Sequence, residues 1–98
     1  MSLAAMLFIP GGDERKLEKI ESLPARSFLL DLEDGVAPSA KADARRLVPA
    51  AMERYAPGRR LWVRVNAADS GLLLDDLEAV VVPGVEGVNL PKAQGHFD

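Results

Sequence analysis

Small or charged residues stand at the end of each of four short apolar segments in this chain. These residues are Pro10-Gly11-Gly12, Asp31 through Asp34 with Gly35, Arg64 with Asn66, and Pro91-Lys92. If the apolar segments are parallel strands, their carboxyl ends lie at one edge of a sheet, where the active sites of α/β proteins are assembled. The sequence therefore predicts one site that gathers carboxylates, an arginine, an asparagine and a lysine.

Asp31, Glu33 and Asp34 form the densest polar group. Carboxylates at such a position can bind Mg²⁺ or orient its waters, because hard cations prefer oxygen ligands. Alternatively, they cap the following loop and pair with Arg or Lys. Both interpretations stay open for Asp31, which lies within its apolar segment, whereas we favour a functional role for Glu33 and Asp34.

Arg64 stands in an otherwise apolar segment, where a guanidinium is costly to bury unless it is paired. Its planar fork suits two-point capture of a carboxylate or phosphate. The alternative is a salt bridge to Asp31 or Asp34, and both interpretations can hold together.

Two further groups each have two interpretations. Pro10-Gly11-Gly12, ahead of a helix, can present backbone N–H groups to a phosphate, although a tight turn is the simpler interpretation. Lys92 can steer an anionic ligand or close a salt bridge.

The apolar segments are residues 6–9, 27–30, 61–65 and 87–90. Their nearly continuous apolar runs are typical of strands buried on both faces of a parallel sheet. Helices are expected over 13–22 with Asp13 as N-cap, over 39–55 with Ser39 as N-cap, and over 72–80. Pro49 should kink or split the second helix. This alternation predicts an α/β fold, either an open doubly wound sheet or a TIM barrel.

Composition excludes several function classes. The 98 residues include 12 Lys+Arg, 15 Asp+Glu and no cysteine, for a net charge of −3. The acidic balance argues against nucleic acid, the lack of cysteine excludes thiolate chemistry, and no apolar run approaches the ~20 residues that cross a bilayer. We expect a cytoplasmic protein with a small-molecule ligand. Because a TIM barrel takes about 250 residues, residues 1–98 are expected to be part of a single larger domain.

Taken together, these motifs resemble one known family. Its opening strand is similar to Met6 through Gly11, and its most specific signature is similar to Asp31 through Pro38 followed by Lys41, Ala44 and Arg45. Val63 through Asn66 and Leu90 through Lys92 resemble two further strands of that family. The family is the HpcH/HpaI aldolase/citrate lyase superfamily, in the citrate lyase beta-subunit-like branch that includes malyl-CoA and citramalyl-CoA lyases. The resemblance covers essentially the whole chain in order and spacing.

The resemblance implies a TIM (β/α)8 barrel, of which this chain covers about the first half. It also implies a homotrimeric enzyme that uses Mg²⁺ to cleave a carbon–carbon bond of a coenzyme A thioester through a metal-stabilised enolate. In residue terms, it implies that Arg64 binds the substrate, with Asn66 and Lys92 beside it. Glu33 and Asp34 would act near the metal waters, and Phe8 and Lys19 would contact CoA. The metal ligands are expected beyond Asp98, so we expect the 98-residue chain to be inactive by itself.

Two positions depart from the family pattern. Ala4 and Asp13 stand where the family often has arginine, which leaves a different acyl carrier or a free keto acid as an alternative to CoA. A non-catalytic or truncated α/β module that retains ligand or partner binding is the second hypothesis. The third, a flavodoxin-like receiver module, requires acidic residues after the first strand and an aspartate at the end of the third. The chain has Pro10-Gly11-Gly12 and Arg64 there instead.

Overall fold

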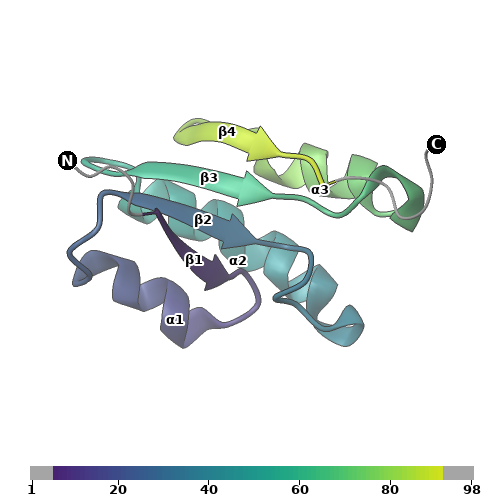
Figure 1. Cartoon of the computed structure of the whole chain (residues 1–98), viewed down its shortest axis with the longest axis horizontal. Coiled ribbons are helices and arrows are strands. Elements are labelled where there is room, and N and C mark those ends of the chain that lie inside the picture. The colour runs from purple at the N-terminus through teal and green to yellow at the C-terminus, as the bar shows by residue number, and fades with distance from the viewer. Residues whose placement is uncertain (1–5, 92–98) are drawn as a thin grey trace.

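A computed structural model describes residues 6–91 and shows one parallel sheet with helices between its strands (Figure 1). The strands are β1 (Met6–Pro10), β2 (Ser27–Asp31), β3 (Arg60–Arg64) and β4 (Val85–Asn89). The helices are α1 (Glu14–Glu18), α2 (Lys41–Tyr55) and α3 (Leu73–Val80). Short 3₁₀ turns occupy Lys19–Glu21, Pro38–Ala40 and Ala68–Ser70. Within these residues, no helix combines the length and apolar character needed to cross a membrane.

The strand order is β1-β2-β3-β4, and all three pairings are parallel. The predicted α/β fold with a parallel sheet is therefore confirmed. A doubly wound sheet reverses its strand order partway across, whereas a barrel adds strands in chain order. The observed order thus favours the barrel over the doubly wound sheet, and closure into a barrel stays a prediction.

The helices pack on one face of the sheet, with α2 running behind β2 and β3 in Figure 1. The core of this layer consists largely of alternate strand residues and apolar helix residues, among them Phe28, Leu30, Leu61, Val63, Val48 and Met52. Because successive side chains of a strand point to opposite faces, the residues between these core positions line the other face, which we call the open face.

Two rows of residues cross the open face in register. The first row consists of Phe8, Leu29, Trp62 and Gly87. The second row, one step closer to the carboxyl ends of the strands, consists of Pro10, Asp31, Arg64 and Asn89. The sheet therefore carries an apolar row next to a polar one.

Burial of the strands differs from the expectation of two buried faces. β2 is buried over four of its five residues, but Met6, Leu7 and Phe8 of β1 are exposed, and no residue of β4 is fully buried. The reason is position, since β1 and β4 are the edges of the described sheet.

The helix predictions are partly wrong. Asp13 does cap α1, accepting a hydrogen bond from the Lys16 N–H at 3.1 Å. Ser39 does not cap the second helix, because it lies inside the 3₁₀ turn that precedes α2. Pro49 does not split α2, which is continuous over 15 residues, and a kink at this residue stays a prediction. Burial of Val48 and Met52 on both sides of the proline explains this, since tertiary packing supplies most helix stability in proteins.

Trp62 and Gly87 lie opposite each other in the apolar row, and the ring of Trp62 leaves no room for a side chain at position 87. A Cβ atom on Gly87 would overlap the ring of Trp62. We expect Gly87→Ala to lower the free energy of unfolding by about 1–3 kcal/mol, because the ring or β4 must shift. Urea unfolding measures this loss. Gly12→Ala is the matched control, since its Cβ would make only ordinary contacts; equal losses in the two variants would contradict the packing account.

Candidate active site

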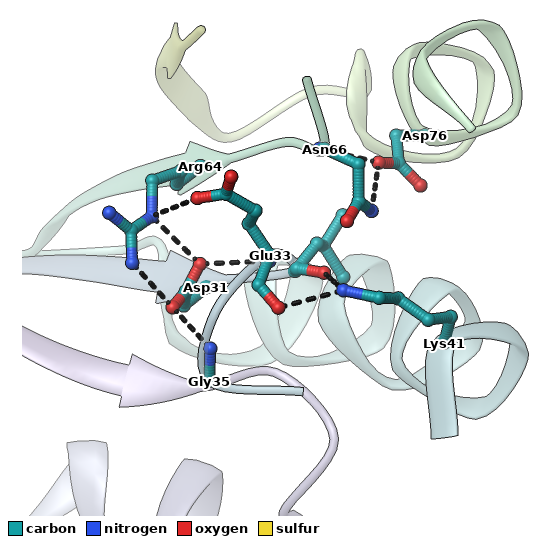
Figure 2. A network of polar contacts seen from close by, with 8 residues as sticks. Asp31, Glu33, Gly35, Lys41, Arg64, Asn66 and Asp76 are labelled. Carbon is teal, nitrogen blue, oxygen red and sulfur yellow. Dashed lines mark hydrogen bonds and ion pairs between the residues drawn. The ribbon is translucent and has the colours of Figure 1, made fainter. Parts of the chain in front are cut away.

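Arg64 and Asp31 form a two-point salt bridge at the carboxyl ends of neighbouring strands (Figure 2). Arg64 Nε donates to Asp31 Oδ1 at 2.9 Å, and Nη2 donates to Oδ2 at 2.8 Å. The two residues end β3 and β2 and lie opposite each other in register, so the fold itself brings them together. The salt bridge that the sequence offered as an alternative for Arg64 is therefore confirmed. Within residues 6–91, Nη1 has no hydrogen-bond partner, and the Arg64 side chain is 24% exposed.

Asp31 also holds the loop that follows β2. Its Oδ1 accepts the N–H of Glu33 at 2.9 Å, and its Oδ2 accepts the N–H of Gly35 at 2.8 Å. A side chain at position 35 would crowd Oδ2, so glycine permits this approach. The loop-capping interpretation of Asp31 is thus confirmed beside its ion pair.

The pKa of Asp31 is lowered from its ordinary value of 3.8. Burial alone would raise this pKa. The hydrogen bond from Arg64, the two backbone N–H groups and the charge of Arg64 outweigh that effect, because all of them favour the ionised form.

This lowered pKa predicts how stability depends on pH. A carboxyl group whose pKa is lower in the folded protein stabilises the fold above its unfolded pKa and loses that contribution as pH falls. We expect wild type to exceed Asp31→Asn in free energy of unfolding by a constant amount above about pH 5. The difference should begin to shrink as pH falls below 3.8 and should disappear as pH falls through the lowered pKa of the folded protein. Chemical denaturation across this pH series tests it, and a difference that stays constant down to the acid limit would contradict the assignment.

Glu33 and Asp34 add negative charge near the guanidinium. Glu33 Oε1 lies 3.6 Å from Arg64 Nε, and Asp34 is exposed. The hydrogen bond with Asp31 raises the pKa of Arg64, desolvation opposes this, and the charges of all three carboxylates raise it further. Arg64 therefore stays cationic in an acidic surrounding.

The Pro10-Gly11-Gly12 segment forms a tight turn against β2. The Gly11 N–H donates to the Asp31 carbonyl oxygen at 2.7 Å, so it is already used within the fold. A Cβ on Gly11 would lie 2.7 Å from Val48 Cγ2 and 2.8 Å from that carbonyl oxygen. Glycine is needed here for close packing of the turn.

Asn66 points to α3, where it meets a buried aspartate. Asp76 Oδ2 accepts the Asn66 backbone N–H at 2.8 Å and the Asn66 side-chain amide at 2.6 Å. Asp76 Oδ1 accepts Arg45 Nε of α2 at 2.9 Å. Asp76 thereby joins α2, α3 and the segment after β3, and the substrate-binding role of Asn66 stays a prediction.

The structure separates the two predicted CoA contacts. Phe8 lies on the open face, 60% exposed, with its ring centroid 5.9 Å from the Arg64 Cζ atom. Lys19 is exposed at the end of α1. Within the described part of the chain, no hydrogen bond or ion pair joins its side chain to Arg64, Asp31 or Glu33. Lys92 and Ala4 lie outside the described residues.

Sequence reasoning missed Asp76, although a signal for it existed. Asp75 and Asp76 are adjacent in a helix, but Asp75 is exposed and Asp76 is 1% exposed. Asp76 falls three residues after Leu73 and four before Val80, which places it on the apolar face of α3. A charged residue on that face needs a buried partner, and this requirement would have singled it out.

The described residues do not form a magnesium site by themselves. No three His, Asp or Glu side chains among residues 6–91 are grouped so that they could hold a metal ion. Both carboxylate oxygens of Asp31 accept hydrogen bonds from Arg64 and from backbone N–H groups. Of the three carboxylates Asp31, Glu33 and Asp34, only the last two could therefore offer oxygens to a metal ion.

The sequence profile of the HpcH/HpaI aldolase/citrate lyase family matches residues 4–96 of this chain. The chain belongs to this family. The resemblance read from the motifs is therefore confirmed. The family's most specific stretch supplies Asp31, Glu33, Lys41 and Arg45, whose side chains all form hydrogen bonds or ion pairs in the structure.

Individual members of the HpcH/HpaI family are about 40% identical to this chain. Citramalyl-CoA lyase of Rattus norvegicus is 39% identical over 94 residues, which are 93% of this chain and 28% of the relative. (3S)-malyl-CoA thioesterase of Cereibacter sphaeroides is 40% identical over 95 residues, 96% of this chain and 33% of the relative. Citrate lyase subunit beta of Escherichia coli is 42% identical over 90 residues, 90% of this chain and 30% of the relative. The chain thus spans about a third of the length of these relatives.

Proposed function

We propose that this chain supplies the amino-terminal part of a carbon–carbon lyase that cleaves a 3-hydroxyacyl-CoA thioester of the citryl-CoA or malyl-CoA type. The observation that carries the proposal is Arg64, a guanidinium fixed by Asp31 at the carboxyl ends of a parallel sheet, with Nη1 free of hydrogen bonds within residues 6–91. Relatives named as a citramalyl-CoA lyase and a malyl-CoA thioesterase support a CoA ester as the substrate.

The chemistry gives Arg64 a defined task. In such a cleavage, the 3-hydroxyl group gives its proton to a base and becomes the carbonyl of a keto acid. The electrons of the broken carbon–carbon bond pass to the thioester fragment as an enolate, which takes up a proton to complete the acyl-CoA product. The fragment that departs as a keto acid carries a carboxylate, which the unused donors of Arg64 can bind. Because Asp31 fixes the guanidinium beforehand, little reorganisation is needed when substrate enters.

Glu33 and Asp34 have a supporting task in this proposal. Their negative charges stabilise the Arg64 guanidinium, which is protonated in any case. Glu33, 3.6 Å from Nε, is also placed to accept a hydrogen bond from a substrate hydroxyl or an ordered water near the guanidinium.

Magnesium dependence, barrel closure and assembly belong to the same proposal. Bound Mg²⁺ would supply Lewis-acid stabilisation of an enolate, with ligands from outside residues 6–91. The strand order supports a TIM barrel that begins with β1 to β4. A trimeric state is proposed on the resemblance alone, and a cytoplasmic location on the composition alone.

Thioester hydrolysis is the second candidate, because relatives named as (3S)-malyl-CoA thioesterases are about as similar as the lyases. Both reactions use a CoA ester with a free carboxylate. Arg64 serves either one in the same way.

Turnover of malyl-CoA, citramalyl-CoA and citryl-CoA by an intact protein that carries residues 1–98 tests the proposal. Consumption of each ester is followed with Mg²⁺ and again after chelation by EDTA. We expect consumption of at least one ester that stops when the metal is removed. Saturable binding without turnover would favour the non-catalytic module instead. If the protein shows no binding and no turnover of any of the three esters, a CoA ester is excluded as its substrate.

A further inference from the structure

Lys41 binds the loop that carries the acidic residues. It is the first residue of α2, and its Nζ donates to the carbonyl oxygens of Leu32 at 2.9 Å and Glu33 at 2.7 Å. Figure 2 shows the lysine side chain reaching back from α2 to this loop. Both bonds involve a charged donor and are stronger than neutral ones.

Asp31 binds the same loop through its N–H groups. The carboxylate accepts from Glu33 and Gly35, while Lys41 donates to Leu32 and Glu33. Four backbone groups of three residues in this loop are thus held by two side chains of opposite charge. Glu33 is held through its N–H by one side chain and through its carbonyl oxygen by the other.

The clamped residue faces the guanidinium. Glu33 Oε1 lies 3.6 Å from Arg64 Nε, and the Glu33 side chain is 22% exposed. Its backbone, held at both the N–H and the carbonyl oxygen, therefore helps to determine where this carboxylate lies.

We propose that Lys41 is a positioning residue for the acidic loop. It acts through Glu33 and does not touch substrate, and its effect on turnover rests on the proposed function. Without its ammonium group, two carbonyl oxygens lose their charged donor, and the loop gains freedom next to Arg64. The carboxylate of Glu33 then no longer keeps a fixed position relative to the guanidinium.

Lys41→Met tests the proposal, because methionine keeps much of the length and removes the charge. The first readout is hydrogen exchange at the Glu33 and Gly35 amides, which we expect to become faster by roughly tenfold or more relative to core amides. The second readout, in an intact protein that carries residues 1–98, is kcat/KM on the best CoA ester, which we expect to fall by roughly tenfold or more through kcat rather than KM. Lys41→Arg should restore much of both. Arg46→Met, which removes an exposed cation from the same helix, should leave both unchanged.

Several results would overturn the proposal. Unchanged exchange at Glu33 and Gly35 in Lys41→Met would do so whether or not the protein turns over a CoA ester. A loss of activity with unchanged exchange would do so as well. If Lys41→Met does not fold, Lys41→Gln, which keeps one amide donor, is expected to show the same changes to a smaller degree, and wild-type behaviour there would contradict it. A wild-type protein that is inactive on all three esters counts against the proposed function, while the exchange measurement still decides the role of Lys41.

Discussion

In an intact protein that carries residues 1–98, Arg64→Ala is expected to lower kcat/KM for a CoA-ester substrate by about 10²-fold or more. The variant loses the cation that the proposal assigns to the substrate carboxylate. It also leaves Asp31 without its charged partner, so the acidic cluster would repel an anionic substrate. Arg64→Lys is expected to remain impaired, because a single ammonium cannot pair with Asp31 at two points and also offer a free donor in the same plane.

Steady-state kinetics on the folded variant, with circular dichroism as the check of folding, measures this loss. Arg60→Ala is a matched control, because Arg60 lies on the same face of β3 at its amino end and is exposed. Wild-type kinetics in folded Arg64→Ala would contradict the substrate-binding role of Arg64. An equal loss in Arg60→Ala would point to a general effect of charge.

Asp76→Ala is expected to lower the free energy of unfolding by about 3–5 kcal/mol. Asp76 is 1% exposed and accepts three hydrogen bonds from Asn66 and Arg45. Its removal leaves a buried backbone N–H and a buried amide without an acceptor, and it unpairs Arg45. Because domains are stable by only about 5–15 kcal/mol, this loss is a large fraction of the total.

Urea denaturation of wild type, Asp76→Ala and Asp75→Ala measures the effect. Asp75 is adjacent in the same helix but exposed, so its loss should change stability by about 0.5 kcal/mol or less. Similar midpoints for the two variants would show that Asp76 does not join the three elements as described.

The strands could be predicted from sequence because each apolar run ends abruptly in polar or small residues. All four predicted strands are present, with bounds within two residues of the observed ones. The helix details were harder to predict. Ser39 has the side chain of an N-cap, but Pro38 starts a 3₁₀ turn that includes Ser39, and Pro49 is tolerated because its neighbours are buried.

For the site, sequence placed Asp31 and Arg64 at the same edge but could not decide between a ligand role and an ion pair. That decision depends on strand register, which puts the two residues directly opposite each other. Asn66 has the same limitation, since its partner Asp76 comes from a helix whose packing the local sequence does not reveal. Lys41 belongs to the family signature, but its contact with two carbonyl oxygens depends on the backbone geometry of the loop, which the sequence does not reveal.

The identity of the CoA product tests the central claim most directly. Malyl-CoA is incubated with Mg²⁺ and an intact protein that carries residues 1–98, and the products are separated and identified by mass spectrometry. Cleavage of the carbon–carbon bond yields acetyl-CoA and glyoxylate in equal amounts, and this is the result we predict, with loss of both products in Arg64→Ala. Free CoA with malate would show hydrolysis of the thioester. Intact substrate here, and likewise with citramalyl-CoA and citryl-CoA, would contradict the proposed lyase.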